Sequence, residues 1–330
     1  MLLWAVLCLV AGYCRAPAVR ADERSNVYQV AVAVPDRSEA NRAAGFQAAM
    51  RVVLVRVTGR LGAASDPELA PLVGAAGRYV QQYRYAIDGR LIVGFDGGAI
   101  ERWLAGVGAP IWGRTRPLTL VLLTVQSGSS GSIVTSDDHS DLATAIDAQA
   151  SLRGIALRWP NAQQLVADGL TYASVIQADP RSLLAVAAHH GADGLLIGHA
   201  TGTAANAPVQ WLFEYQTETA QTVGTAAGVD SAADAYASIY AVSGAIAPVE
   251  IEIRGVRNLA DYARVERLFE SMTSVSNVAV RSLHGDTVRL QLASRGGAAP
   301  LVRMLALDGN LVPDTTPADD GGALSYRLRQ

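Results

Sequence analysis

Few side chains of this chain could bind a metal or move a proton. Besides carboxylates, there are five histidines: His139, His189, His190, His199 and His284. One of the adjacent pair could ligate a divalent ion together with His199 and Asp193, because imidazole and carboxylate both suit such ions. His189 and His190 end a predicted helix, however, and their side chains diverge by about 100°, so they cannot readily share one ion. We favour a simpler interpretation, that these imidazoles lie at the negative end of that helix.

A second group of possible ligands, Asp137-Asp138-His139, directly precedes a helical pattern. Acids and imidazole together could hold a divalent ion, but acids in this position are typical helix caps, and we favour the cap. A carboxylate pair for glycan hydrolysis could come from a set whose spacing selects no two members: Asp96, Glu101, Glu250, Glu252 and Glu266. Glu250 and Glu252 fall on the outer face of an alternating strand, where we expect solvated carboxylates.

Most motifs for covalent chemistry are missing from the sequence. No G-x-S-x-G elbow occurs, and Gly106-Val107-Gly108 lacks the third glycine of a dinucleotide fingerprint. All 27 basic residues are arginine, which excludes a Schiff base, a Walker A phosphate loop and a Ser–Lys dyad. We therefore predict no catalytic, cofactor-binding or metal-binding residue.

One segment, Trp112-Gly113-Arg114-Thr115-Arg116-Pro117, is a candidate for recognition. An aromatic ring beside two guanidinium groups could clasp an anion or a partner chain, because arginine presents a planar fork of donors. In the alternative, Trp112 holds two parts of the chain together while the arginines pair with acids. We favour the alternative.

The first 21 residues resemble an export signal. Residues 2–13 form a short apolar run, and Val19-Arg20-Ala21 places small residues where a signal peptidase reads them, which predicts cleavage after Ala21. The run is too short for a stable membrane anchor. Cys14, preceded by Tyr13, and an uncleaved leader leave lipid anchoring or membrane retention as alternatives. Cleavage would remove both cysteines, Cys8 and Cys14, and with them any thiol nucleophile, disulfide or thiolate metal site.

Composition describes an ordinary globular protein. Of 330 residues, 50% are hydrophobic and 17% are charged, so the chain can bury sizeable cores. The whole chain has a formal net charge of −3, and loss of Arg15 and Arg20 with the leader lowers it further. A negative surface argues against non-specific nucleic-acid binding. We also expect no integral membrane segment, and the oligomeric state stays open.

The order of predicted elements divides the chain into three units of an α/β (α+β) fold. Residues 24–113 form an N-terminal unit, in which Ser38 caps a helix ending at Thr58-Gly59 and a second helical pattern covers Glu68–Tyr83. Residues 116–247 form a central mixed sheet with helices. It starts with the apolar run Leu118–Thr124, followed by a flexible serine-rich loop over 125–136. Residues 248–330 read β-α-β-β-α-β, the ferredoxin-like order, which implies no function.

Several motifs along the chain are distinctive: Val34-Pro35-Asp36, Val55-Arg56-Val57-Thr58-Gly59, Tyr79-Val80-Gln81-Gln82-Tyr83-Arg84-Tyr85, Gly94-Phe95-Asp96, Trp112-Gly113-x-x-Arg116-Pro117, and Ala188-x-x-Gly191-Ala192-Asp193-Gly194-Leu195-Leu196-Ile197-Gly198 with Trp211 beyond it. Together they resemble the DUF2066 family, exported proteobacterial proteins of unknown function. The resemblance implies a location in the Gram-negative envelope and supplies no reaction, ligand or site residue.

Together these observations predict an exported periplasmic protein that binds or scaffolds an envelope protein or cell-wall component without catalysing a reaction. The alternative is an envelope hydrolase that uses a carboxylate pair or a His/Asp metal site. The sequence selects neither a ligand nor a reaction.

Overall fold

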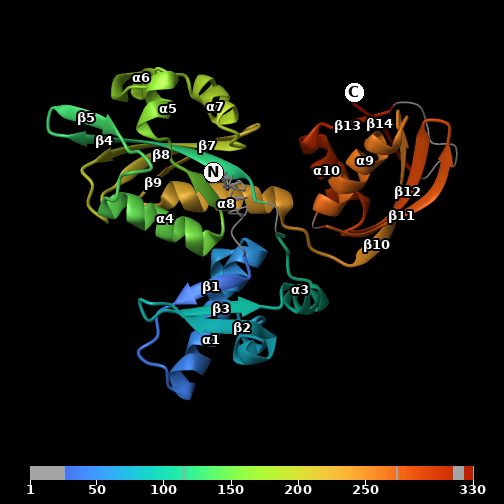
Figure 1. The fold of residues 1–330 in the computed structure, drawn as a ribbon, viewed down its shortest axis with the longest axis horizontal. Helices are drawn as coiled ribbons and strands as arrows, with labels where there is room; N and C mark the ends of the chain where they lie inside the picture. Colours follow the sequence, from blue (N-terminus) through green and yellow to red (C-terminus); the bar gives the residue numbers. More distant parts are fainter. Residues whose placement is uncertain (1–26, 114–115, 273, 315–322, 330) are drawn as a thin grey trace, which may run out of the picture.

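The computed structural model describes residues 27–113, 116–272, 274–314 and 323–329. These residues form three β-sheets with helices packed on them, so the predicted α+β class is confirmed (Figure 1). The predicted export signal, residues 1–21, lies outside the described residues. The predicted unit boundaries after residues 113 and 247 stay predictions.

The first sheet has three antiparallel strands in the order β1-β3-β2. Its strands are β1 (Gln29–Val32), β2 (Val80–Tyr85) and β3 (Leu91–Phe95). The long helix α1 (Glu39–Thr58) buries residues such as Met50, Val53 and Leu54 in the same hydrophobic core as Leu91 and Val93 of β3. Two shorter helices, α2 (Ala70–Gly74) and α3 (Gly97–Gly106), complete this part of the chain.

Helix α1 begins and ends where its sequence predicts. The Ser38 side chain accepts a hydrogen bond from the backbone N–H of Asn41, and Gly59 ends the helix with φ 71°, a left-handed conformation that suits glycine. The helix predicted over Glu68–Tyr83 is correct only in part: α2 and a short 3-10 helix, Ala76–Tyr79, lie within it, but its last residues belong to strand β2. There Tyr83 packs edge-on against Phe46 of α1, a tertiary contact that overrides the local helical pattern.

The second sheet is mixed, with the order β5-β4-β7-β8-β9 and β6 paired to β4. Its strands are β4 (Leu118–Ser127), β5 (Ser130–Ile133), β6 (Ala156–Arg158), β7 (Gly194–Thr201), β8 (Val209–Tyr215) and β9 (Glu218–Val223). Leu120–Leu123 of β4 are buried on both faces, as their continuous apolar pattern predicts. The serine-rich stretch is not a loop, because β4 and β5 pair across it as a hairpin.

Helices cover both faces of this sheet (Figure 1). Helices α4 (Asp141–Arg153) and α8 (Ala227–Tyr240) form one core with Val121 and Leu123. On the opposite face α6 (Tyr172–Gln177) and α7 (Pro180–His189) pack on Leu120 and Leu122, next to the short helix α5 (Ala162–Ala167). Asp179 caps α7 with proline at its first position, as predicted.

The third sheet has the order β11-β12-β10-β14-β13 and one strand more than the predicted β-α-β-β-α-β series. Its elements are β10 (Ile246–Arg254), α9 (Leu259–Ser271), β11 (Val275–His284), β12 (Thr287–Arg295), α10 (Ala298–Asp308), β13 (Leu311–Pro313) and β14 (Leu324–Leu328). The additional strand, β13, pairs antiparallel with β14. The last strand, β14, pairs parallel with β10.

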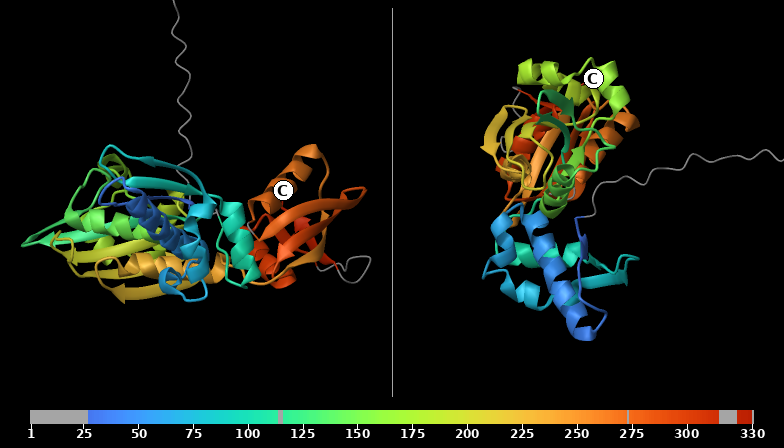
Figure 2. Two further views of the ribbon diagram at one scale, coloured as in Figure 1. Left: turned by 90° about the horizontal axis from the view of Figure 1, so that it is seen from below. Right: turned by 90° about the vertical axis from the view of Figure 1, so that its left-hand side faces the viewer.

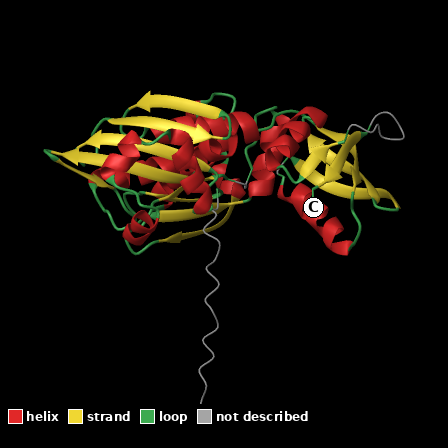
Figure 3. Cartoon of the chain, turned by 90° about the horizontal axis from the view of Figure 1, so that it is seen from above, coloured by secondary structure: helices red, strands yellow, loops and turns green. Residues whose placement is uncertain are grey.

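The three sheets are arranged unevenly in space. The third sheet with its helices lies at one end of the long axis of the molecule, as two views from opposite sides show (Figures 2 and 3). The first sheet lies on the side of the second sheet that α4 and α8 cover, with the C-terminal end of α1 pointing toward these two helices (Figure 1). Within the described residues, no helix is both long enough and apolar enough to cross a membrane.

Substituting Gly59 with alanine tests how closely α1 approaches the second sheet's helices. A Cβ at this position would lie 2.4 Å from the Cβ of Ala237 and would also be strained at positive φ. We expect Gly59→Ala to lower the free energy of unfolding by about 3 kcal/mol, from overpacking together with left-handed strain. Gly89→Ala is the matched control, because Gly89 has φ +83° with no atom near its Cβ position. Equal losses in denaturant titrations of the two variants would contradict the close approach.

Candidate functional site

The predicted recognition segment lies at the joint between the first and second sheets. Trp112 is fully buried, and its backbone N–H donates to the Val57 carbonyl at 2.6 Å. Its indole packs on Gly59 and lies 6.2 Å from the ring of Tyr236 in α8. Trp112 therefore holds two parts of the chain together, as the favoured interpretation predicts. The other half of that interpretation, that the arginines pair with acids, is wrong for Arg116, which binds carbonyl oxygens. Arg114 lies outside the described residues.

Arg116 belongs to the same joint. Its guanidinium stacks on Trp112, with Cζ 3.6 Å from the ring centroid. Its Nη2 donates to the carbonyl oxygens of Arg56 at 2.7 Å and of Trp112 at 3.0 Å. Its Nε and Nη1 are buried and have no hydrogen-bond partner among the described residues. Burial lowers the pKa of Arg116 to about 9, so it is still charged at neutral pH, where carbonyl dipoles at the end of α1 stabilise it.

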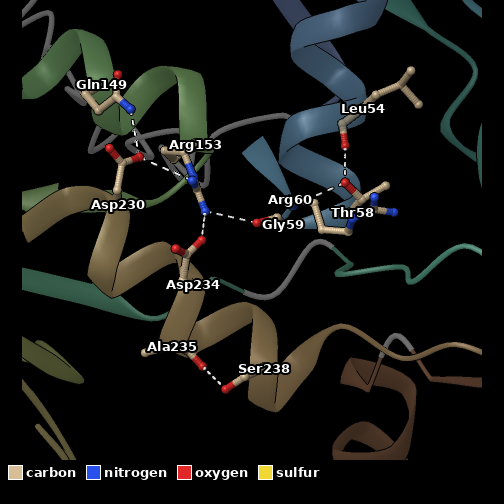
Figure 4. A network of polar contacts seen from close by, with 10 residues as sticks. All are labelled: Leu54, Thr58, Gly59, Arg60, Gln149, Arg153, Asp230, Asp234, Ala235 and Ser238. Atoms are coloured by element: carbon tan, nitrogen blue, oxygen red, sulfur yellow. Dashed lines mark hydrogen bonds and ion pairs between the residues drawn. The ribbon is translucent and has the colours of Figure 1, made fainter. Parts of the chain in front are cut away.

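Two further arginines cross the joint. Arg56 of α1 donates from Nε to the Ser151 carbonyl at 2.8 Å and from Nη1 to the Gln29 carbonyl at 2.9 Å. Burial lowers its pKa to about 10. Arg153 of α4 is buried and donates to the Gly59 carbonyl at 2.9 Å, and it forms ion pairs with Asp230 and Asp234 of α8 (Figure 4). In the following, the joint means the contact between the first and second sheets that Arg56, Arg116 and Arg153 make together with Trp112.

The histidine and aspartate candidates do not come together. His190 is bound on both ring nitrogens, with Nε2 2.5 Å from Asp168 and Nδ1 3.3 Å from the Gln164 amide nitrogen. Gln164 lies in the first turn of α5 and Asp168 directly follows that helix, whereas His190 directly follows α7, so His190 fixes α5 to α7. Asp193 instead accepts a hydrogen bond from the Leu118 N–H at 2.7 Å. Among the described residues, no three His, Cys, Asp or Glu side chains are placed to hold a metal ion.

His199 lies on β7, where its Nδ1 is 2.6 Å from the hydroxyl of Thr124 on the neighbouring strand. Burial lowers the pKa of His199. The other histidines of the chain, His139, His189 and His284, are exposed. The acids before α4 act near its start, because Asp138 accepts from the Ser140 N–H and Ser140 is the N-cap. The cap predicted at Asp137-Asp138-His139 is therefore wrong: Ser140 caps α4, and Asp138 binds the backbone of that cap residue.

The five candidate carboxylates are dispersed over the chain. Asp96 caps α3, Glu101 accepts from the Tyr28 hydroxyl, and Glu266 accepts from Tyr262. Glu250 is exposed, as predicted. Glu252 corrects the prediction: it is 2% exposed and paired with Arg254 at 2.9 Å and Arg289 at 2.8 Å. The strand pattern assigns Glu252 to the outer face but does not reveal the arginines that enclose it there.

The sequence interpretation missed one surface cluster. Tyr83 and Tyr85 of β2 lie beside Arg37, Arg42 and Phe46. The alternation of Tyr83 and Tyr85 with Gln82 and Arg84 is the signal of a strand, which the predicted helix over Glu68–Tyr83 leaves out of account. We call these five residues the Tyr–Arg strip.

Comparison with known proteins gives one family assignment for part of the chain. Residues 21–113 match a domain of unknown function, DUF8605. The predicted DUF2066 membership is therefore wrong, since the matching domain is a different one. No curated protein matches the chain.

Two solved structures show a low similarity. The LpoB C-terminal domain from Salmonella enterica has a TM-score of 0.22 and 18% identity, covering 32% of this chain and 81% of that chain. The LpoB C-terminal domain from Escherichia coli has a TM-score of 0.20 and 20% identity, covering 33% and 80%. TM-scores of this size support no inference about this chain.

Removing the Arg153 guanidinium should weaken the joint. We expect Arg153→Met to lower the free energy of unfolding by about 2 kcal/mol, because the Gly59 carbonyl loses a charged donor. The control is Arg60→Met: Arg60 is about half exposed in its ion pair with Asp66, which should contribute less than about 1 kcal/mol. Chemical denaturation of both variants measures the difference. Equal stabilities would show that Arg153 contributes nothing to the joint.

His199 should make stability depend on pH. Its pKa is lowered in the folded state from 6.5, so the unfolded chain binds the proton first as the pH falls. We expect the melting temperature to decrease as the pH falls below about 6.5, and His199→Gln to reduce this decrease. His189→Gln, at an exposed position, should keep the wild-type pH profile. Identical profiles for all three proteins would rule out the contribution of His199.

Proposed function

We propose that this protein is an exported, non-enzymatic binding or scaffolding protein of the cell envelope. The observation that carries the proposal is that charged and histidine side chains of this protein hold parts of the chain together. Arg56, Arg116 and Arg153 join the first and second sheets, and His190 with Asp168 joins α5 to α7. Such contacts fix the relative positions of surfaces, which is what a scaffold requires.

The export signal predicted from residues 1–21 supports the location. The arrangement of the molecule supports the binding role, because Arg56 and Arg153 hold the first and second sheets together, so the surfaces of these two parts keep a fixed relation. The third sheet lies at one end of the molecule (Figure 2). A partner that contacts two such surfaces gains affinity from their fixed geometry, because less conformational freedom is lost on binding.

The alternative hypothesis, that the protein is an envelope hydrolase, gives His190 a different role. In that case muropeptide or ester substrates would be turned over, with loss on chelation or on substitution of His139 or His190. Under our proposal His190→Gln removes a partner from Asp168 and should lower the melting temperature, whereas His139→Gln at an exposed position should leave it unchanged.

Turnover assays on the purified full-length protein decide between the two. We expect no turnover of either substrate class above that of the heat-denatured protein. In-cell crosslinking should recover a stoichiometric envelope partner. Turnover that is lost on chelation, together with no recovered partner, would overturn the proposal.

A further inference from the structure

The Tyr–Arg strip runs from the N-terminal half of α1 to β2. The Phe46 and Tyr83 ring centroids are 5.4 Å apart, and those of Tyr83 and Tyr85 are 6.5 Å apart. Arg42 lies 5.7 Å from the centre of the Tyr83 ring, and Arg37 lies 4.9 Å from that of Tyr85. Each guanidinium is therefore held in place by a ring. Tyr83 is 48% exposed, so the strip faces solvent.

The guanidinium groups of this surface are not neutralised. Arg37 and Arg42, and the exposed Arg84 of β2, form no ion pair within the described part of the chain. Nearby, Asp36 is occupied by the Ser38 N–H and the Asn41 amide, while Glu39 is exposed. The strip is thus locally positive on a chain whose net charge is −3.

Strand β2 is also an open edge of its sheet. Among the described residues it pairs with β3 on one side and with no strand on the other, where its backbone groups are left open. Arg56 links β1, at the opposite edge, to α4 of the second sheet, so the open edge of β2 lies on the side away from the joint (Figure 1). Ile87, in the turn after β2, is fully exposed at 110%. An extended chain can approach this edge freely.

We propose that the edge of β2 and the Tyr–Arg strip form a docking surface for an extended acidic segment of a partner protein. The inference rests on the binding function proposed above and assigns it a surface. An extended segment satisfies the free backbone groups of β2 as an added strand. Its carboxylates on the face of the strip pair with Arg37 and Arg42, in the bidentate geometry that arginine favours. Tyrosine and arginine are the residue types that dominate binding energy at interfaces.

A lipid surface is the less suitable occupant. Membrane binding increases with the apolar area that enters the bilayer. Here the fully exposed apolar side chain is Ile87, and the carboxylate of Asp88 follows it directly. Open backbone groups on β2 gain nothing from a lipid headgroup layer, whereas a peptide strand pairs with them.

The test uses the full-length protein and a short peptide in which glutamate alternates with valine. We expect the peptide to bind, to slow hydrogen exchange of the β2 amides, and to lose affinity about tenfold with Arg42→Glu. Arg51→Glu is the matched control, because Arg51 is exposed and has no ion pair in the described chain. It lies nine residues further along the same helix, about two and a half turns, and therefore on the opposite face from Arg42. This variant should bind like wild type.

Three outcomes overturn the inference. Equal affinity for the same peptide with glutamine in place of glutamate removes the acidic requirement. Protection of amides elsewhere, or equal losses with Arg42→Glu and Arg51→Glu, removes the surface. Binding to vesicles of anionic phospholipid that Arg42→Glu abolishes, with no peptide binding, assigns the surface to lipid instead.

In-cell crosslinking separates this inference from the proposed function. A photoreactive residue at Gln81, exposed on β2, should crosslink to an acidic segment of the recovered partner, and Arg42→Glu should abolish that crosslink. The control carries the photoreactive residue at Val166, exposed on α5. Recovery of the same partner from both positions and from Arg42→Glu keeps the binding function but overturns this docking surface.

Discussion

The C-terminal end of helix α1 is buried, and the rest of the structure depends on how its carbonyl groups find donors. The last carbonyls of any helix lack partners within it, and leaving them buried and unpaired is costly. Here the Gly59 N–H satisfies Val55, Arg116 satisfies Arg56, and the Trp112 N–H satisfies Val57. The carbonyl groups of Arg56 and Val57 therefore take their hydrogen bonds from residues that follow the first sheet in the chain. These hydrogen bonds help to join the first sheet to the second.

Because carbonyl groups are the acceptors at this joint, most of its hydrogen bonds do not depend on pH. A backbone oxygen does not titrate, so the bonds from Arg56 and Arg116 keep their strength across the pH range in which carboxylates become protonated. Only Arg153 also relies on carboxylates, those of Asp230 and Asp234, and both are partly solvated. Arginine suits this role because its fork has several donors and stays charged even when burial lowers its pKa.

The sequence predicts local features well and distant contacts poorly. Ser38, Gly59 and Asp179-Pro180 mark helix ends through interactions within a few residues, so their boundaries are correct. Strand β2 depends on Phe46, far away in the chain, and was mistaken for a helix. Glu252 is enclosed by Arg289, 37 residues further on, so strand alternation alone indicated exposure. Two of the motifs behind the mistaken family assignment, Val55–Gly59 and the one that contains Trp112 and Arg116, lie at the joint, where their side chains make contacts between distant parts of the chain.

The same chemical pair acts differently at two depths in this molecule. Arg116 over Trp112 and Arg42 over Tyr83 are both cations on aromatic rings. In the joint, water is excluded, the attraction is strengthened, and the guanidinium is held by carbonyl groups of its own chain. On β2 the ring is half exposed and the guanidinium keeps its capacity for an outside anion. Solvent access, rather than residue type, therefore separates the arginines that hold this protein together from those that remain available to a partner.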